Sequence, residues 1–194
     1  MQHIGSVSGF RHVGDRLVHQ GYIWHVAVGT FESPTGERFE RDIVRSPGAV
    51  GALPLIFDAE GNPSVVLVRQ YRAPFDDYVI EIPAGMRDVP DEPVAETAAR
   101  ELIEEVGLQA GHLERMLDFY PSAGLTDSVL YLFLATDLTP VERATHGPEE
   151  DDMQVLHLPL SEAIDMVLRH EIHDAKTIIG LLLADRRIRS GDLG

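Results

Sequence analysis

Two apolar strands separated by a short polar turn place the strongest constraint on the fold of this chain. The stretches "AVGALPLIFD" (residues 49–58) and "SVVLVRQYR" (residues 64–72) flank the turn "AEGNP". Apolar residues run through both stretches almost without interruption, which is typical of strands buried on both faces. The sequence therefore predicts a mixed sheet whose two faces are both covered.

Further strands and helices follow along the rest of the chain. Apolar and β-branched stretches predict strands at residues 77–85, 112–120, 129–138 and 153–160. Apolar periodicity predicts helices at residues 94–106, 161–170 and 174–187. Strands interleaved with few helices indicate an α/β fold, with a central mixed β-sheet between helices on both faces.

The first part of the chain predicts a separate β element. Residues 20–45 contain the β-branched and aromatic stretch "GYIWHVAVGTF", the turn "SPTGE" and the alternating stretch "RFERDIVR". We therefore expect an N-terminal antiparallel β extension over residues 1–45 and a main domain over residues 46–194. An isolated hairpin is marginal in water, so these strands are expected to pair with a second subunit or to pack on the main domain.

The charge and composition of the chain disfavour several classes of partner and chemistry. Acidic residues outnumber basic ones 32 to 16, and the formal net charge of -16 repels nucleic acid and anionic membranes. The absence of cysteine excludes thiol catalysis and disulfides. Apolar runs are too short to cross a bilayer, and the first residues lack the pattern of a secretory signal. We expect a cytoplasmic protein that binds neither nucleic acid nor membrane.

Three glutamates are crowded on the helix predicted at residues 94–106. Glu101, Glu104 and Glu105 repel one another at spacings where each like-charged pair costs about 0.2–0.5 kcal/mol. Arg100 lies four positions before Glu104, but the i±3 and i±4 neighbours of Glu101 and Glu105 include no cation. Such carboxylates provide the oxygen ligands that Mg²⁺ or Mn²⁺ accepts. The spacing predicts a divalent metal site, with a solvated acidic face as the alternative.

The limits of this helix are marked in the sequence. Asp91 is expected to cap it, Pro93 suits its first turn, and Gly107 suits the position after its end. Glu101 and Glu105 are expected to lie half sheltered along the edge of a buried stripe. That stripe is predicted to consist of Val94, Ala95, Ala98, Leu102 and Val106.

The stretch "GMRDVPDEPVAETAARELIEEVGL" (residues 85–108) resembles the Nudix box, GX5EX7REUXEEXGU with U aliphatic. The match is complete from Glu92 onward, and Gly85 stands one residue early, so that six residues separate it from Glu92 instead of five. The flanking stretches "LVRQYR", "EIPAG", "YPSAGLTD" and "DAKTIIGLLLA" resemble the ADP-ribose pyrophosphatases of this superfamily. The resemblance implies a Nudix-type α/β/α sandwich.

The resemblance also implies a reaction, namely the Mg²⁺-dependent hydrolysis of ADP-ribose to AMP and ribose 5-phosphate, with Mn²⁺ as a possible substitute. The metal ligands implied for this sequence are the backbone carbonyl of Ala84 and the carboxylates of Glu101, Glu104 and Glu105. Arg100 would orient the glutamates, and Glu104 and Glu105 would take part in catalysis. Arg72 would reach the diphosphate or the terminal ribose, and Arg69 and Gly124 are further candidates for substrate binding.

The general base is where the sequence departs from this family. Ser128 stands where related pyrophosphatases often place a glutamate, and serine is a poor base at neutral pH. The role would pass to Asp127, to the acidic stretch at residues 149–152 with Glu150 as its representative, or to a glutamate of the helix. The departure leaves open another nucleoside diphosphate sugar as substrate, and also a nucleotide sensor that does not cleave its ligand. The N-terminal strands, together with the resemblance, imply a homodimer.

Overall fold

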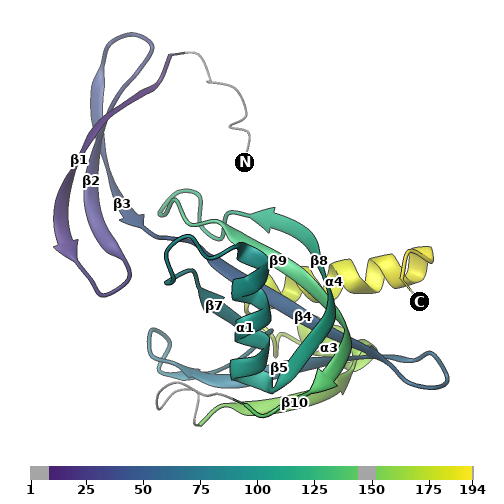
Figure 1. Ribbon diagram of the computed structural model, residues 1–194. Helices are drawn as coiled ribbons and strands as arrows, with labels where there is room; N and C mark the ends of the chain where they lie inside the picture. The colour runs from purple at the N-terminus through teal and green to yellow at the C-terminus, as the bar shows by residue number, and fades with distance from the viewer. Residues whose placement is uncertain (1–8, 144–151, 194) are drawn as a thin grey trace. The chain divides into compact units, whose positions relative to one another are not determined.

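The computed structural model describes residues 9–143 and 152–193 of the 194-residue chain (Figure 1). These residues form two compact units. The first contains residues up to 48 together with residues 122–128, and the second contains residues 49–121 and the chain from residue 129 onward. The expected division into residues 1–45 and 46–194 stays a prediction about domains.

The first unit is built on a three-stranded antiparallel sheet. Its strands, in the order β1-β2-β3, are β1 (Arg11–Gln20), β2 (His25–Glu32) and β3 (Arg38–Arg45). Strands β2 and β3 and the turn between them were expected, whereas β1 was not. All ten residues of β1 are exposed, so the alternation of buried and exposed positions that usually reveals a strand is absent from it.

The second unit contains a seven-stranded mixed sheet. Its main path has the order β10-β5-β4-β9-β8, and β6 and β7 pair with β5 and β4 respectively. The pair β4–β9 is parallel and the other pairs are antiparallel. The strands are β4 (Ala49–Phe57), β5 (Pro63–Arg72), β6 (Asp77–Glu81), β7 (Ala84–Met86), β8 (Leu108–Phe119), β9 (Leu130–Pro140) and β10 (Gln154–Pro159).

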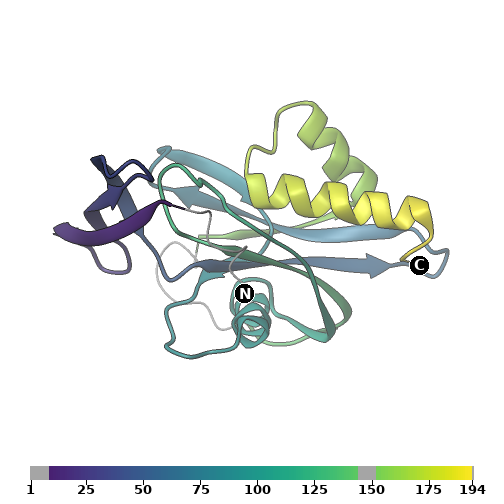
Figure 2. The ribbon, with the colours of Figure 1, turned by 90° about the horizontal axis from the view of Figure 1, so that it is seen from above.

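Helices cover both faces of this sheet. Helix α1 (Val94–Val106) lies on one face, and α3 (Leu160–Leu168) and α4 (Ala175–Ser190) lie on the other (Figure 2). The arrangement confirms the expected α/β/α sandwich with a central mixed sheet. Among the described residues, no helix combines the length and the apolar character needed to span a membrane.

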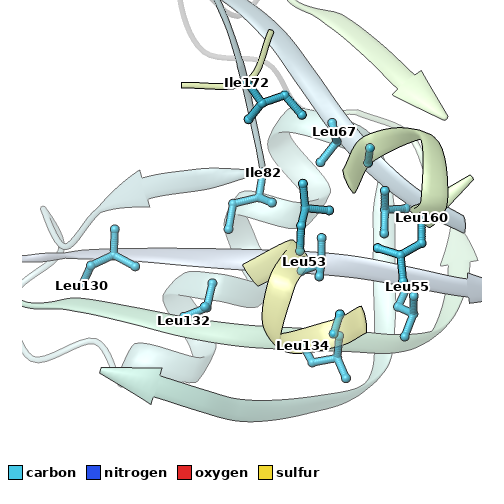
Figure 3. Packing of buried hydrophobic residues seen from close by; sticks show 13 residues of the cluster. Leu53, Leu55, Leu67, Ile82, Leu130, Leu132, Leu134, Leu160 and Ile172 are labelled. Carbon is cyan, nitrogen blue, oxygen red and sulfur yellow. The ribbon is translucent and has the colours of Figure 1, made fainter. Parts of the chain in front are cut away.

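Alternate residues of the central strands supply two hydrophobic cores. Leu53, Leu55 and Leu67 belong to the core beneath α3 and α4, which Figure 3 shows from close by. Val50 and Val66 belong to the core beneath α1. Because each face of the sheet has its own helical layer, these strands are apolar at odd and even positions alike. Fully burying one such side chain contributes about 1.5–3 kcal/mol.

The segment predicted as one strand at residues 77–85 is divided into β6 and β7. At the junction, the backbone N–H of Ile82 donates to Thr177 Oγ1 at 2.7 Å, and the Pro83 carbonyl accepts from Ala52 N at 2.9 Å. Proline has no N–H to continue the ladder with β5, so the chain crosses from β5 to β4 here. The crossing brings Ala84 and Gly85 beside α1.

Both ends of α1 were predicted, but the cap residue at its start was wrong. Pro93 is the N-cap residue, with φ -60° and ψ 139°, and no side chain caps the helix. Asp91 has a left-handed backbone with φ 61° instead. Gly107 ends the helix in the left-handed conformation, as expected. The predicted stripe is buried at Ala98, Leu102 and Val106, whereas Ala95 is exposed.

Candidate active site

Two carboxylates one helical turn apart are buried on α1. Glu101 is 8% exposed and Glu105 is 4% exposed, so the expectation that they are half sheltered was wrong. The chain that enters β7 covers them. A buried carboxylate must be compensated by hydrogen bonds or opposite charge, so their surroundings decide what they can do.

The backbone of Ala84 and Gly85 lies directly against these carboxylates. The N–H of Ala84 donates to Oε2 of Glu105 at 2.9 Å. A Cβ added to Gly85 would lie only 2.0 Å from Cδ of Glu101, so a side chain at this position would displace the carboxylate. The expected metal-site residues Ala84, Glu101 and Glu105 are therefore brought together.

Arg100 lies at the centre of a cluster of acidic side chains. Its Nη1 is 2.8 Å from Oε1 of Glu101 and 2.8 Å from Oε2 of Glu104, and its Nε is 3.3 Å from Oε1 of Glu92. Burial alone would lower the pKa of Arg100, but the hydrogen bond to Glu92 and the charges of Glu101 and Glu104 raise it above its ordinary value. The idea that Glu101 lacks a local cation was wrong, because the adjacent Arg100 reaches it outside the i±3 and i±4 spacing.

The oxygen donors on α1 suit a hard divalent cation in chemical type. Carboxylates and backbone carbonyls are the ligands that Mg²⁺ and Mn²⁺ prefer. Within residues 9–143 and 152–193, no three His, Asp or Glu side chains are grouped in the way that holds a metal ion. In this arrangement the Arg100 guanidinium bridges Glu101 and Glu104. The metal site therefore stays a prediction about these residues.

Arg72 forms a second charged group beside the sheet. Its Nε and Nη2 donate to the two oxygens of Glu81 at 2.6 and 2.7 Å. The hydrogen bond to Glu81 is the main cause that raises the pKa of Arg72, and the charge of Glu105 adds to it. Glu81 is therefore the main partner of Arg72, and Glu105 on α1 contributes a smaller electrostatic attraction. It also lines a pocket of about 630 Å³ between β6 and the start of α4.

Arg69 is not brought to the carboxylates. Side chains alternate along β5, so Arg69 and Arg72 point to opposite faces of the strand. The guanidinium of Arg69 lies over the ring of Tyr78, 4.1 Å from its centroid. The hydroxyl of Tyr78 donates to Asp152 at 2.6 Å.

The first unit contains two further predicted residues, Asp127 and Gly124. The carboxylate of Asp127 accepts from Arg45 Nη1 at 3.1 Å and from the backbone N–H of Ser46 at 3.0 Å. Gly124 lines a pocket of about 450 Å³ in this unit. Phe31 and Phe39, stacked with centroids 5.6 Å apart, line the same pocket. In the acidic stretch at residues 149–152, Glu150 lies outside the described residues, whereas Asp152 is described and accepts from Tyr78.

Sequence reasoning missed Glu81 as part of the site. A usable signal was present, because Glu81 is an acidic residue between Ile80 and Ile82 in a stretch predicted as strand. Charged residues are almost never fully buried unless they are paired. Phe31 and Phe39 were also missed, since aromatic residues on strands occur in most sheets and carry no specific signal.

Comparison with known proteins decides the family. A family model described as the NUDIX domain matches residues 46–179. The chain belongs to the Nudix family. It is therefore a Nudix hydrolase acting on pyrophosphate bonds, and the stretch that resembles the Nudix box, residues 85–108, lies within the matched range.

Individual relatives extend the similarity over most of the Nudix chain. An ADP-ribose pyrophosphatase of Bacillus subtilis (strain 168) is 34% identical over 165 residues, which cover 85% of this chain and 86% of the relative. A GDP-mannose pyrophosphatase of Shigella flexneri serotype 5b (strain 8401) is 34% identical over 137 residues, or 66% and 70% of the two chains. The crystal structure of an ADP compounds hydrolase shares the fold, with a TM-score of 0.80 at 22% identity over 96% of this chain and 97% of that one.

Proposed function

We propose that this Nudix hydrolase cleaves the diphosphate bond of ADP-ribose and releases AMP and ribose 5-phosphate. The observation that carries the proposal is the buried pair Glu101 and Glu105 against the backbone of Ala84 and Gly85. The similarity to an ADP-ribose pyrophosphatase over 85% of the chain supports the choice of substrate.

The proposed site has an anionic part that would hold a metal ion and a cationic part that would bind the diphosphate. Nudix hydrolases generally need a divalent metal ion, and we propose Mg²⁺, with Mn²⁺ as a substitute. The carboxylates of Glu101, Glu104 and Glu105 and the carbonyl of Ala84 would hold it. When bound, such an ion neutralises phosphate charge and lowers the pKa of a coordinated water. Arg72 would bind a diphosphate oxygen through its guanidinium.

The proposed role of Arg100 is to position the carboxylates. Its contacts to Glu92, Glu101 and Glu104 fix the rotamers of three side chains at once. A proton acceptor is also needed for the attacking water, and Asp127 and Glu150 are the proposed candidates. Asp127 already accepts two hydrogen bonds, one from Arg45 and one from the backbone N–H of Ser46, which occupy both of its carboxylate oxygens. This observation favours Glu150.

A second candidate substrate is another nucleoside diphosphate sugar. The similarity to a GDP-mannose pyrophosphatase supports it, and so does Ser128 at the position where related pyrophosphatases often have a glutamate. The similarity to two pyrophosphatases supports cleavage of the nucleotide over a nucleotide sensor that does not cleave its ligand.

The decisive assay compares substrates under one set of conditions. The full chain is incubated with ADP-ribose, ADP-glucose or GDP-mannose together with Mg²⁺ or Mn²⁺, and the nucleoside monophosphate is quantified. We expect the highest kcat/KM with ADP-ribose and no turnover after addition of a chelator. A higher kcat/KM with GDP-mannose or ADP-glucose contradicts the proposed substrate, and undiminished turnover in the chelator contradicts the metal requirement.

We further propose that the protein is a homodimer in the cytoplasm. Exposed apolar side chains on and beside β1, including Phe10, Leu17 and Val18, support the dimer because such surface is usually covered by a partner. Light scattering should give twice the 21.5 kDa of one chain. Particles of one chain at all concentrations contradict the dimer, and recovery outside the cytoplasmic fraction contradicts the location.

A further inference from the structure

Glu81 lies between two cations in the interior of the second unit. The carboxylate is only 3% exposed. Its two oxygens accept hydrogen bonds from Arg72, and the ammonium group of Lys176 contacts one of the same oxygens. Burial by itself would raise the pKa of Glu81, but these two cations outweigh burial and hold the pKa below its ordinary value. Glu81 is thus an anion shared by two positive groups.

Lys176 is held in place by the start of α4. It is the only lysine of the chain and is 8% exposed. Asp174, the N-cap of α4, lies 3.1 Å from the Lys176 ammonium and accepts from the backbone N–H of Thr177 at 3.0 Å. The hydroxyl of Thr177 in turn accepts from Ile82 N at the end of β6. The first turn of α4 is therefore fixed to the strand that carries Glu81.

The second cation, Lys176, reduces the extent to which Glu81 neutralises the positive charge of Arg72. With one carboxylate as its sole partner, the guanidinium would be neutralised and would offer little to a further anion. Arg72, Glu81 and Lys176 together carry one net positive charge. Asp174 is more exposed and lies at the N-terminal end of α4, where the helix dipole offsets negative charge. With Asp174 included the four side chains are neutral overall, so the contribution of Lys176 is to offset the charge of Glu81 beside Arg72.

Within residues 9–143 and 152–193, the contact with Glu81 takes up one edge of the Arg72 guanidinium and leaves Nη1 outside it. Glu81 occupies the edge formed by Nε and Nη2 of Arg72. The N–H groups on Nη1 point away from that edge because the guanidinium is planar. Arg72, Glu81 and Lys176 all line the pocket of about 630 Å³, so an anion that enters there meets the group directly.

We propose that Glu81 and Lys176 are positioning residues for Arg72 in diphosphate binding. Glu81 fixes the plane of the guanidinium, and Lys176 offsets the charge of Glu81 so that Arg72 keeps its attraction for a diphosphate oxygen. This inference rests on the proposed function, in which Arg72 binds the substrate diphosphate. In the alternative, the ion pairs only attach α4 to the sheet. The experiment must distinguish this purely structural role from the positioning role.

The test measures binding of inorganic pyrophosphate by calorimetry in the presence of a chelator. Lys176→Met removes the charge and keeps most of the side-chain volume. We expect the dissociation constant to rise about tenfold, the size of one lost charge-assisted interaction. Arg72→Ala should raise it at least as much, and Lys176→Met should add nothing in the Arg72→Ala background, because the lysine acts through the arginine.

The matched control is Arg187→Met. Arg187 ties the other end of α4 to β8 through Glu114 at 2.9 Å. This variant should lose stability without losing affinity for pyrophosphate. If Lys176→Met lowers only the unfolding temperature, or weakens binding equally with and without Arg72, the positioning role is wrong. Absence of pyrophosphate binding by the unaltered protein also overturns it. Should Lys176→Met not fold, Lys176→Arg keeps the charge and must retain pyrophosphate binding close to that of the unaltered chain.

The two proposals fail in different ways. Normal pyrophosphate binding that depends on Lys176, without hydrolysis of ADP-ribose, overturns the proposed function and keeps the positioning role of Lys176. If the unaltered protein hydrolyses ADP-ribose and Lys176→Met does not change KM, the positioning role of Lys176 is overturned and the proposed function stands. In the active enzyme, we expect this variant to raise KM more than it lowers kcat.

Discussion

The carboxylate of Glu101 occupies the space where a side chain of residue 85 would begin. A Cβ on Gly85 would lie 2.0 to 2.4 Å from the carboxylate atoms of Glu101, and the backbone of Gly85 does not have positive φ. Glycine is therefore required at this position for space and not for backbone conformation. The glycine at the start of the Nudix box keeps Glu101 and Glu105 within reach of the β7 backbone.

Gly85→Ala tests this contact. The added methyl group must displace Glu101, so we expect turnover to fall at least about tenfold and stability to fall by about 1–3 kcal/mol, as for an overpacked site. Gly180→Ala on α4 is the control, because its Cβ would have ordinary contacts of 3.7 to 3.9 Å. Steady-state kinetics and urea unfolding of both variants give the answer. Full activity of Gly85→Ala would show that Glu101 is free to move aside.

Glu105→Gln tests the carboxylate pair. Glutamine keeps an oxygen that accepts from Ala84 N, so the fold should survive while the negative charge is lost. We expect turnover to fall by at least about two orders of magnitude, the size usual for a lost transition-state interaction. Glu96→Gln, in the first turn of the same helix, should have near-normal activity. Comparable activity of the two variants would remove Glu105 from the proposed metal site.

Arg100→Lys tests whether the arginine positions the glutamates. A lysine has one nitrogen and cannot bridge Glu101 and Glu104 while also reaching Glu92. We expect kcat to fall more than tenfold, by about 1.4 kcal/mol or more in transition-state stabilisation. Arg169→Lys is the control, since Arg169 also pairs with two acidic residues but in an exposed position. Equal kinetics for both variants would assign Arg100 to surface charge only.

The pH dependence of stability follows from Glu81. Burial opposes ionisation, but Arg72 and Lys176 keep the pKa of Glu81 in the folded chain below its ordinary value of 4.5. Its contribution to stability is therefore complete above the ordinary pKa and is lost as the pH falls through the lower folded pKa. Glu81→Gln should be less stable than the unaltered protein at neutral pH, and the difference should narrow in acid. Urea unfolding along a pH series measures this, and a constant difference would contradict the paired state of Glu81.

The general base is open to a direct comparison of Asp127→Asn with Glu150→Gln. Loss of the true base should abolish the acidic limb of the pH profile of kcat, in addition to lowering turnover. We expect this from Glu150→Gln, because Asp127 is engaged by Arg45 and Ser46. Asp127→Asn should lower activity without moving the acidic limb. The reverse pattern would make Asp127 the base.

Much of the fold could be predicted from the sequence because the central strands and α1 have strong local signals. Apolar residues on β4 and β5 predicted a sheet buried on both faces, and α1 was predicted at residues 94–106, the range it occupies. Strand β1 could not be found in this way, since none of its residues is buried. The β6–β7 division was also missed, although Pro83, which cannot continue the ladder with β5, was a local signal for it.

The site was predictable where its residues are close in sequence. Spacing along α1 predicted Glu101, Glu104 and Glu105 as candidate metal ligands, but a rule that counts only three and four positions overlooked Arg100 beside Glu101. The group around Glu81 joins β5, β6 and α4, whose pairing is set by tertiary structure. No local periodicity carries that information.

The burial and pairing of Lys176 also provide a way to measure local opening of the folded chain. Because the chain has one lysine, whose ammonium is paired with Glu81 and Asp174, we expect acetylation of this amine to be slow until the first turn of α4 separates from β6. Mass spectrometry of the peptide around residue 176 would follow the reaction in time. The rate of acetyl incorporation therefore reports how often this part of the molecule opens while the rest stays folded.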